Sequence, residues 1–167
     1  MATFKCEDCG KEHDLSELAI VHKKPDHYFK IPANERAARI KINDDLCIID
    51  NRLFLIRGVL EVPVKGVEGG AIQWGVWALV KRPDFDRYRE LWDADIDPNE
   101  PPFRGRLSGG PHGYPEADMA TVTIHMQSNG QRPIFKAVSA ETRLGKEQRE
   151  GISTVRLHKL LEIFNKK

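Results

Sequence analysis

The sequence has little of what marks several large classes of protein. In 167 residues it holds only three cysteines, and no segment approaches the roughly 20 consecutive apolar residues of a membrane-spanning helix. Its 26 basic and 25 acidic residues leave a formal charge of +1, so no net field draws the molecule onto nucleic acid or an anionic membrane. Internal repeats and low-complexity tracts are lacking too. These absences exclude a repeat array and argue against a helical membrane protein and a nucleic-acid-binding protein.

The first ten residues also lack a secretion signal. They contain Lys5, Glu7 and Asp8, and they have no apolar segment of the kind that a signal peptide requires. Three cysteines, two of them in a tight pair, fit a reducing compartment better than a secreted disulfide framework. We therefore expect a soluble, cytoplasmic protein.

No nucleophile elbow, Walker loop or dinucleotide-binding fingerprint is recognisable, so no catalytic residue is assigned. The chain is 40% hydrophobic and 31% charged, which suits one core that is stable without disulfides. A second full domain is not expected. The prediction is a single domain over residues 1–167, with a cysteine-bearing amino-terminal segment at 1–31 and a body at 32–167.

A dense run of β-favouring residues is present between residues 46 and 80. Turn-forming residues at 50–51 and 66–70 divide this run into three segments, which predicts a three-stranded meander. Both faces of the third strand are largely apolar, so Trp74 and Trp77 are predicted to lie in the core. This meander is expected to be the centre of the fold.

Further strands and helices follow the meander. Strands over 121–127 and 133–138 flank residues 128–131, where Asn-Gly favours the turn of a β-hairpin. Asp84 is expected to cap a helix that carries an apolar stripe, and Ser153 is expected to cap the last helix. The predicted fold class is therefore α+β: a mainly antiparallel sheet of about five strands with packed helices.

Two more segments complete the predicted body. A helix is expected from Pro32 through about Lys41. Residues 95–118, rich in proline and glycine, form the longest irregular segment and are the expected place for a binding loop. Side chains from which a site could be made there are Arg104, Arg106, Ser108, His112, Tyr114 and Asp118.

A metal-binding knuckle is predicted near the amino terminus. Cys6 and Cys9 are separated by two residues, and Gly10 can adopt the positive φ that lets both thiolates turn towards one ion. Such ligands suit zinc, and a closed set of four protein ligands would make the metal structural. Further donors could be His13, Cys47, His22 or His27, and the preferred ligand set is Cys6, Cys9, His13 and Cys47.

Two other interpretations of the cysteines stay open. Cys6 and Cys9 could be a redox pair, although that chemistry usually places the first cysteine at the start of a helix after a strand. All three thiols could also be unliganded, with Cys47 an ordinary buried core residue.

A possible enzyme site is built from scattered polar residues. Arg57 and Glu61 lie among apolar residues of the second strand, as a covered ion pair or as the floor of a shallow site. In a hydrolase, His125 or His112 could be the general base. The side chains that could assist are Arg57, Glu61, Asp118 and Arg132.

Short motifs along nearly the whole chain form a familiar pattern. They are Cys6-Glu7-Asp8-Cys9-Gly10 with His13, Asp45-Leu46-Cys47-Ile48-Ile49-Asp50, Ile56-Arg57-Gly58, Leu60-Glu61-Val62-Pro63, Trp74-Gly75-Val76-Trp77, Arg87-Tyr88, Leu91-Trp92, Pro101-Pro102-Phe103, Tyr114-Pro115, His125, Gly130, Arg132-Pro133, Glu147-Gln148-Arg149 and Gly151-Ile152. The pattern resembles a bacterial family known only as the domain-of-unknown-function family numbered 2199. The segment from Asp14 to Lys24 departs from it. The resemblance implies a single-domain bacterial protein in which Cys6, Cys9 and Cys47 act together, and it implies no activity.

Three functional hypotheses follow. The first is a non-enzymatic cytoplasmic module that binds another protein or has an accessory role, stabilised by a structural zinc. The second is a small hydrolase-like enzyme with a site near His125, Arg57 and Glu61. The third is nucleic-acid binding through the knuckle and the arginine-bearing helix, which the balanced charge makes the least favoured.

Overall fold

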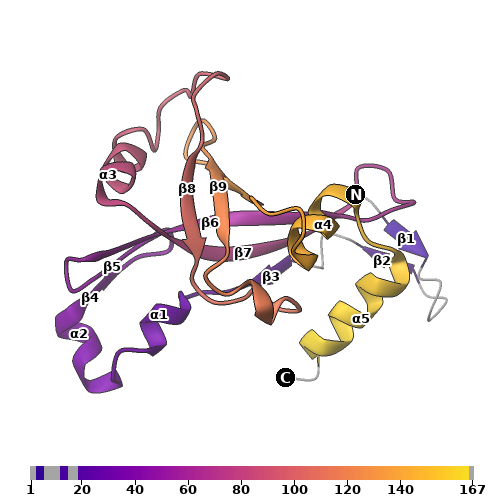
Figure 1. Ribbon diagram of the computed structural model, residues 1–167, viewed down its shortest axis with the longest axis horizontal. Helices are drawn as coiled ribbons and strands as arrows, with labels where there is room; N and C mark the ends of the chain where they lie inside the picture. Colours follow the sequence, from indigo (N-terminus) through magenta and orange to yellow (C-terminus); the bar gives the residue numbers. More distant parts are fainter. Residues whose placement is uncertain (1–2, 6–11, 15–18, 166–167) are drawn as a thin grey trace.

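The computed structural model describes residues 3–5, 12–14 and 19–165 (Figure 1). Strands fill the middle of the molecule, and helices lie around the ends of the sheet. Within the described ranges, no helix is both long and apolar enough to cross a bilayer.

Two long strands form the centre of the fold. β6 (Leu53–Pro63) and β7 (Ala71–Val80) pair in antiparallel register along almost their whole length. The segment between them contains Gly66 and Gly69 at φ values of +80° and +67°, which glycine adopts without a Cβ clash. The second and third strands of the predicted meander are therefore present.

Three further strands close these two into a barrel. β8 (Phe103–Leu107) pairs antiparallel with β7, and β9 (Thr121–His125) and β10 (Ile134–Ala137) follow in antiparallel order. β10 then returns to β6 in parallel register at Ile134 and Phe135. The result is a closed, mixed five-stranded barrel within an eight-stranded sheet.

This barrel corrects the predicted fold class, a mainly antiparallel sheet of about five strands. The closure depends on the parallel pairing of β6 with β10, two strands far apart in the chain. Alternation of apolar residues shows which side chains face inward, but it does not identify the neighbour of each strand. The β9–β10 hairpin matches the prediction, and its Asn129 and Gly130 both have positive φ. No group of metal-binding side chains forms a knuckle in the described part of the chain.

Shorter strands extend the sheet beyond the barrel. β5 (Leu46–Ile49) pairs antiparallel with the first half of β6, and β4 (Ile40–Ile42) pairs antiparallel with β5. β3 (Ala19–Val21) runs parallel to β7. A separate small sheet joins β1 (Thr3–Lys5) to β2 (Glu12–Asp14), and Figure 1 places it at the opposite end of the molecule from β4 and β5.

The helix predicted from Pro32 to about Lys41 is wrong in its last part. A short 3-10 turn, η2 (Ala33–Glu35), and one helical turn, α2 (Arg36–Arg39), lead directly into β4. Ile40 is buried there against the cluster that contains Cys47. Tertiary packing of a β-branched residue therefore outweighs the helical preference of the residues before it.

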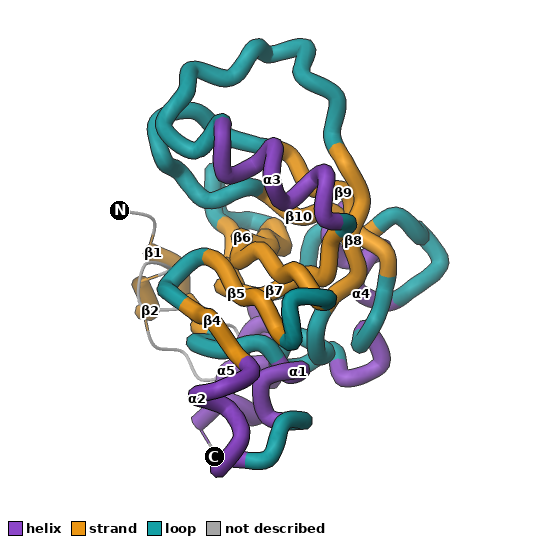
Figure 2. Tube along the Cα trace, turned by 90° about the vertical axis from the view of Figure 1, so that its left-hand side faces the viewer, coloured by secondary structure: helices purple, strands orange, loops and turns teal. Residues whose placement is uncertain are grey.

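Helix α3 (Arg82–Glu90) begins earlier than predicted. Its cap residue is Lys81, and Pro83 lies in the first turn, where proline loses no hydrogen bond. Asp84 therefore lies inside the first turn rather than at the cap, where its charge still favours the positive end of the helix dipole. In Figure 2 α3 lies above β6, and its Phe85 and Tyr88 pack with Phe54 and Ile56 of that strand.

The remaining helical elements follow the sequence more closely. Ser153 caps α5 as predicted, since its hydroxyl accepts from the Arg156 N–H. Thr142 caps α4 in the same way, by accepting from the Gly145 N–H. The bounds of these elements are α1 (Asp26–Phe29), η3 (Pro115–Ala117), α4 (Arg143–Glu150) and α5 (Thr154–Asn165).

Buried side chains form three clusters around the sheet. The largest fills the barrel and includes Trp74 and Phe135. A second cluster lies on the outer face of β5, β6 and β7 and includes Cys47 and Trp77. A third lies beneath α3 and includes Tyr88. Trp74 and Trp77 are 0% and 1% exposed, which confirms that both are core residues.

Candidate binding trough

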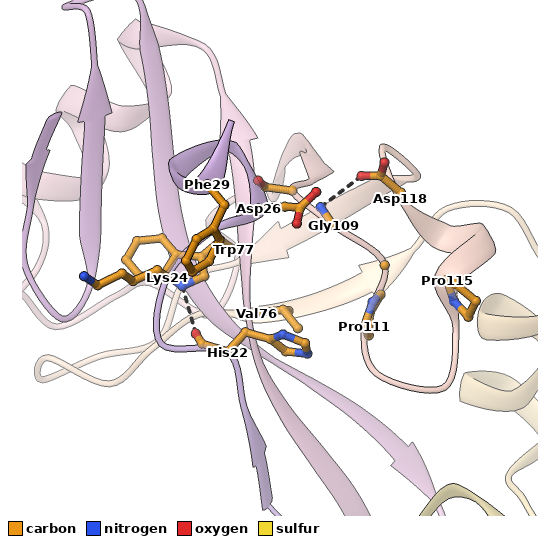
Figure 3. Close-up of a pocket in the computed structure, with 12 residues that line it drawn as sticks. His22, Lys24, Asp26, Phe29, Val76, Trp77, Gly109, Pro111, Pro115 and Asp118 are labelled. Atoms are coloured by element: carbon orange, nitrogen blue, oxygen red, sulfur yellow. Dashed lines mark hydrogen bonds between the residues drawn. The ribbon is translucent and has the colours of Figure 1, made fainter. Parts of the chain in front are cut away.

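Two adjoining hollows lie where β3 and α1 meet the segment between β8 and η3 (Figure 3). Each has a volume of about 420 Å³, and His22, Gly110, Pro111 and Pro115 line both. Because they share these residues, we treat them as one continuous feature and call it the trough. It is a concave site with polar groups at both ends, which is the usual form of a ligand site.

His22 anchors one wall of the trough. Its N–H donates to the Gly75 carbonyl oxygen at 2.9 Å, and its own carbonyl oxygen accepts from the Trp77 indole at 3.0 Å. The His112 N–H donates to His22 Nε2 at 3.3 Å. An acceptor at Nε2 places the imidazole proton on Nδ1, so His22 is neutral in this arrangement. These bonds join β3, β7 and the loop after β8.

Ser108 and His27 form a second link between the two walls. The Ser108 hydroxyl oxygen accepts from the His27 backbone N–H at 3.2 Å, and it lies 2.6 Å from His27 Nδ1. In the tautomer that carries its proton on Nε2, His27 accepts the proton of this hydroxyl at Nδ1. Burial, and next the charge of Lys30, lower the pKa of His27, while Asp118 and Asp26 oppose the shift. The imidazole is accordingly neutral and can accept this bond at neutral pH.

One end of the trough is acidic. Asp118 Oδ1 accepts from the Gly109 N–H at 2.9 Å, and Asp26 approaches the same glycine, since a Cβ built there would lie 2.9 Å from the Asp26 Cβ. Gly109 has a φ of +92°, which glycine adopts readily, and its missing Cβ leaves the space that Asp26 occupies. Figure 3 shows Asp26 and Asp118 at the same edge of the hollow, with Phe29 and Trp77 beside Asp26. Phe29 is 60% exposed.

The other end is basic. Arg143 and Arg156 line it, and their Nε atoms lie 3.6 and 3.1 Å from Glu147 Oε1. The Tyr114 hydroxyl donates to Glu147 Oε2 at 2.6 Å, and burial, followed by Glu147, raises the pKa of Tyr114. Arg156 Nη2 is buried and has no hydrogen-bond partner in the described part of the molecule. Two guanidinium groups thus share one carboxylate, which leaves an excess positive charge.

The side chains proposed for a hydrolase lie in different parts of the molecule. His112 lines the basic end of the trough, whereas His125 lies on β9 with its Nε2 2.9 Å from the Thr123 hydroxyl. Burial and the charge of Lys136 lower the pKa of His125. Glu61 Oε1 accepts from the Gln73 amide at 2.7 Å. The strand register aligns His125 with Ile134, and Ile134 with Val59 of β6, so the site expected near His125, Arg57 and Glu61 lies on the barrel strands and stays a prediction.

Arg57 is buried, but the predicted ion pair with Glu61 is wrong. Its Nη1 donates to the Asp44 carbonyl oxygen at 3.0 Å, and its guanidinium carbon lies 5.7 Å from the centre of the Trp77 ring. Burial lowers the pKa of Arg57, and the charge of Arg132 adds to that shift. Arg57 therefore holds the 44–45 turn against the sheet.

Of the four predicted zinc ligands, the described residues include only His13 and Cys47, which lie far apart. Cys6 and Cys9 lie outside the described residues. His13 belongs to β2 and Cys47 to β5, which Figure 1 shows at opposite ends of the molecule. Cys47 is a free, fully buried thiol, and burial raises its pKa to about 11, the opposite of what a metal-bound thiolate needs. Zinc binding through Cys6 and Cys9 stays a prediction.

The sequence identified only one side of this site. Ser108, His112 and Asp118 lie in the loop already expected to bind, but Asp26 and His27 were missed as its partners. The Lys24-Pro25-Asp26 break could have marked the start of a short helix at a loop, although nothing in it indicates contact with Ser108, 81 residues further on. Contacts at such a separation come from the fold rather than from local pattern.

A comparison with family models matches residues 5–152 to the family described as "Uncharacterized protein conserved in bacteria (DUF2199)". The chain belongs to this family. The comparisons of this chain with curated proteins and with solved structures gave no match. The family assignment confirms the resemblance seen in the sequence, and it places a DUF2199 chain on the barrel described above.

Proposed function

We propose that this DUF2199 protein is a non-enzymatic accessory module that binds a segment of a partner protein in the trough. The observation that carries the proposal is the separation of charge along the trough. Asp26 and Asp118 lie at one end, and Arg143 and Arg156 lie at the other. A partner segment with a basic and an acidic side chain, spaced to reach both ends, would meet the opposite charge at each.

The walls of the trough support this proposal because they are already fixed. The His22 and Ser108 hydrogen bonds join its two sides without a ligand, so little ordering is needed on binding. Phe29 adds an exposed aromatic ring beside the carboxylates, where it could pack on the stem of a lysine or arginine. The nearby Lys24 ammonium is held by the Tyr28 hydroxyl at 2.9 Å.

Selection of displayed random peptides on the purified protein tests the proposal. We expect enrichment of peptides that carry an arginine or lysine together with an acidic residue. A synthetic peptide from that pool should bind the double variant Asp26→Asn/Asp118→Asn about tenfold more weakly, because two partly solvated charges contribute modestly to affinity. The matched control, Asp84→Asn/Asp86→Asn on α3, should bind like the wild type. Peptides without charged residues, or equal affinity for the double variant, would contradict the proposal.

A second function is favoured by one distance, the 2.6 Å between Ser108 Oγ and His27 Nδ1. In an acyl hydrolase, Ser108 Oγ would bond to the carbonyl carbon of an ester while His27 Nδ1 takes the hydroxyl proton and passes it to the leaving alcohol. Water would then release the acid. Against this function, the same hydroxyl already accepts a backbone N–H and serves as a structural link.

A fluorophosphonate probe separates the two functions. A nucleophilic Ser108 would be labelled, and Ser108→Ala would abolish both labelling and ester hydrolysis. Ser139→Ala, a change at an exposed serine, is the matched control. We expect no labelling of the wild type or of either variant, because the binding function requires no activated serine.

A further inference from the structure

A second concave feature lies between α3 and the β4–β5 hairpin, away from the trough. It consists of two hollows of about 280 and 360 Å³ that share Asn43, Leu46 and Arg89. We call it the α3 groove. The smaller of the two hollows is lined by Tyr88 and Trp92, which meet edge to face with ring centres 5.6 Å apart. The groove therefore joins an aromatic wall to a polar rim.

The Tyr88 hydroxyl is an anomaly in this wall. The residue is only 3% exposed, and its hydroxyl is buried without a hydrogen-bond partner in the described part of the protein. Buried polar groups are nearly always hydrogen-bonded, so an unpaired hydroxyl beside a hollow indicates a missing acceptor. The charge of Asp45 acts on Tyr88, but Asp45 is not a partner of this hydroxyl, and its Oδ1 accepts from Arg132 Nε at 2.7 Å.

The hydroxyl is a donor at physiological pH. Burial, followed by the charge of Asp45, raises the pKa of Tyr88, and Arg132 opposes the shift only in part. A protonated phenol surrounded by apolar side chains binds an acceptor oxygen better than a cation.

Charges around the groove also favour an anion. The exposed cations Lys41 and Arg89 line it, and the one lining carboxylate, Asp45, is already paired with Arg132. Apolar side chains supply the rest of the surface: Leu46, Ile48, Phe85 and Trp92. The groove thus offers positive charge at its rim, an apolar wall and one buried donor.

We propose that the α3 groove binds a small anion with an aromatic or apolar body, whose oxygen accepts the hydrogen bond of the Tyr88 hydroxyl. Arg89 pairs with the anionic group, and the body packs against Trp92 and Leu46. Because the Tyr88 hydroxyl is buried, a side chain at the surface of the groove must move before a ligand can reach it. We expect this side chain to be the exposed Arg89, whose guanidinium lies 5.9 Å from the centre of the Phe85 ring.

Titration of the full-length, ¹⁵N-labelled protein tests this proposal with defined probes. Phenylacetate and phenyl phosphate carry the expected charge, whereas phenylacetamide and phenethylamine are the neutral and cationic controls. We expect the two anions to shift amide signals of α3 and of residues 43–48, with dissociation constants at least tenfold below those of the controls. Shifts spread over the whole protein, or equal affinity for the neutral probe, would overturn the proposal.

Two variants separate a binding role of Tyr88 from a structural one. Tyr88→Phe should weaken phenylacetate binding about tenfold or more and leave the melting temperature of the free protein unchanged or higher. Tyr28→Phe removes a tyrosine hydroxyl elsewhere and should not alter binding. Unchanged affinity in Tyr88→Phe overturns the proposal, and so does a large fall in its melting temperature, which would mean that the hydroxyl is already satisfied without a ligand.

The rim cation is tested on the same helix. Arg89→Gln should weaken binding of both anions and leave the weak binding of phenylacetamide unaltered. Arg82→Gln is the matched control, because Arg82 lies on α3 but outside the groove. Equal loss of affinity in both variants would show a general effect of charge and overturn the assignment of Arg89.

Discussion

The trough and the α3 groove differ in how their buried hydroxyl groups are paired. In the trough, Tyr114 and Ser108 are both hydrogen-bonded to protein partners. In the groove, the Tyr88 hydroxyl is buried without a partner among the described residues. A satisfied group strengthens the folded state, whereas an unsatisfied one costs stability that a ligand can restore. The hydroxyl groups of the trough therefore stabilise its walls, whereas we expect the Tyr88 hydroxyl to gain a partner when a ligand binds.

The largest effect on stability is expected from a steric clash in the wall of the trough, at Gly110. A Cβ at Gly110 would lie 2.4 Å from the Tyr114 carbonyl oxygen and 2.7 Å from the Pro115 backbone, atoms that cannot move aside cheaply. We expect Gly110→Ala to lower the free energy of unfolding by about 3 kcal/mol. Urea unfolding measures this change. Gly75→Ala is the control, since its Cβ would meet its neighbours at an ordinary 3.8 Å, and a similar loss there would contradict the steric argument.

Paired removal of two tyrosine hydroxyls tests the comparison most directly. Tyr114→Phe takes a donor from Glu147 and should lower the free energy of unfolding by about 2 kcal/mol. Tyr88→Phe removes an unsatisfied donor and should leave stability unchanged or raise it by about 1 kcal/mol. Both values come from thermal or urea unfolding at pH 7. If the two variants lose the same stability, the distinction between the two regions fails.

A smaller effect is expected from acid. The pKa of His27 is lower in the folded protein than the ordinary 6.5, so the unfolded chain takes up this proton first as the pH falls. Stability should be fully present above pH 6.5 and decline below it, by at most about 1.4 kcal/mol per pH unit for one proton. His125, whose pKa is also lowered, adds to the same trend.

Urea unfolding between pH 5 and pH 8 measures this dependence. In His27→Gln the slope below pH 6.5 should be smaller than in the wild type, because the contribution of His27 is removed. An unaltered slope would show that the Ser108–His27 bond does not depend on a neutral imidazole.

The smallest effect concerns a residue outside both regions. If zinc binds through Cys6 and Cys9, Cys47→Ala should leave the zinc content of the purified protein unchanged, because Cys47 is buried in a separate cluster. Elemental mass spectrometry measures this content, and Cys6→Ala is the positive control. Loss of zinc in Cys47→Ala would mean that the cysteine is a ligand after all.

Several elements were predictable because local chemistry decides them. Asn129-Gly130 accepts positive φ, and a hairpin forms around it. The two apolar faces of residues 71–80 require cover on both sides, so Trp74 and Trp77 are buried. Ser153 has a hydroxyl at the right place to cap the last helix.

The errors have a common physical origin. Helix-favouring residues before Ile40 predicted a longer helix, but burial of that side chain beside Cys47 made it part of a strand. Arg57 and Glu61 lie on the same face of β6, but Arg57 donates a hydrogen bond to the Asp44 carbonyl oxygen, in a turn that precedes this strand in the chain. In each case a contact made by the folded protein outweighed a local preference.

Local pattern was enough to predict β6, β7, the hairpin of β9 and β10 and the burial of both tryptophans, because alternation and turn chemistry act between near neighbours in the chain. Only the tertiary structure decided that β10 lies parallel to β6 and closes a barrel. The same packing brings Ser108 to His27 and places Asp26 beside Asp118, and it leaves Tyr88 without a partner. These contacts depend on how segments far apart in the chain pack together, and the local patterns of the sequence contain no information about that packing.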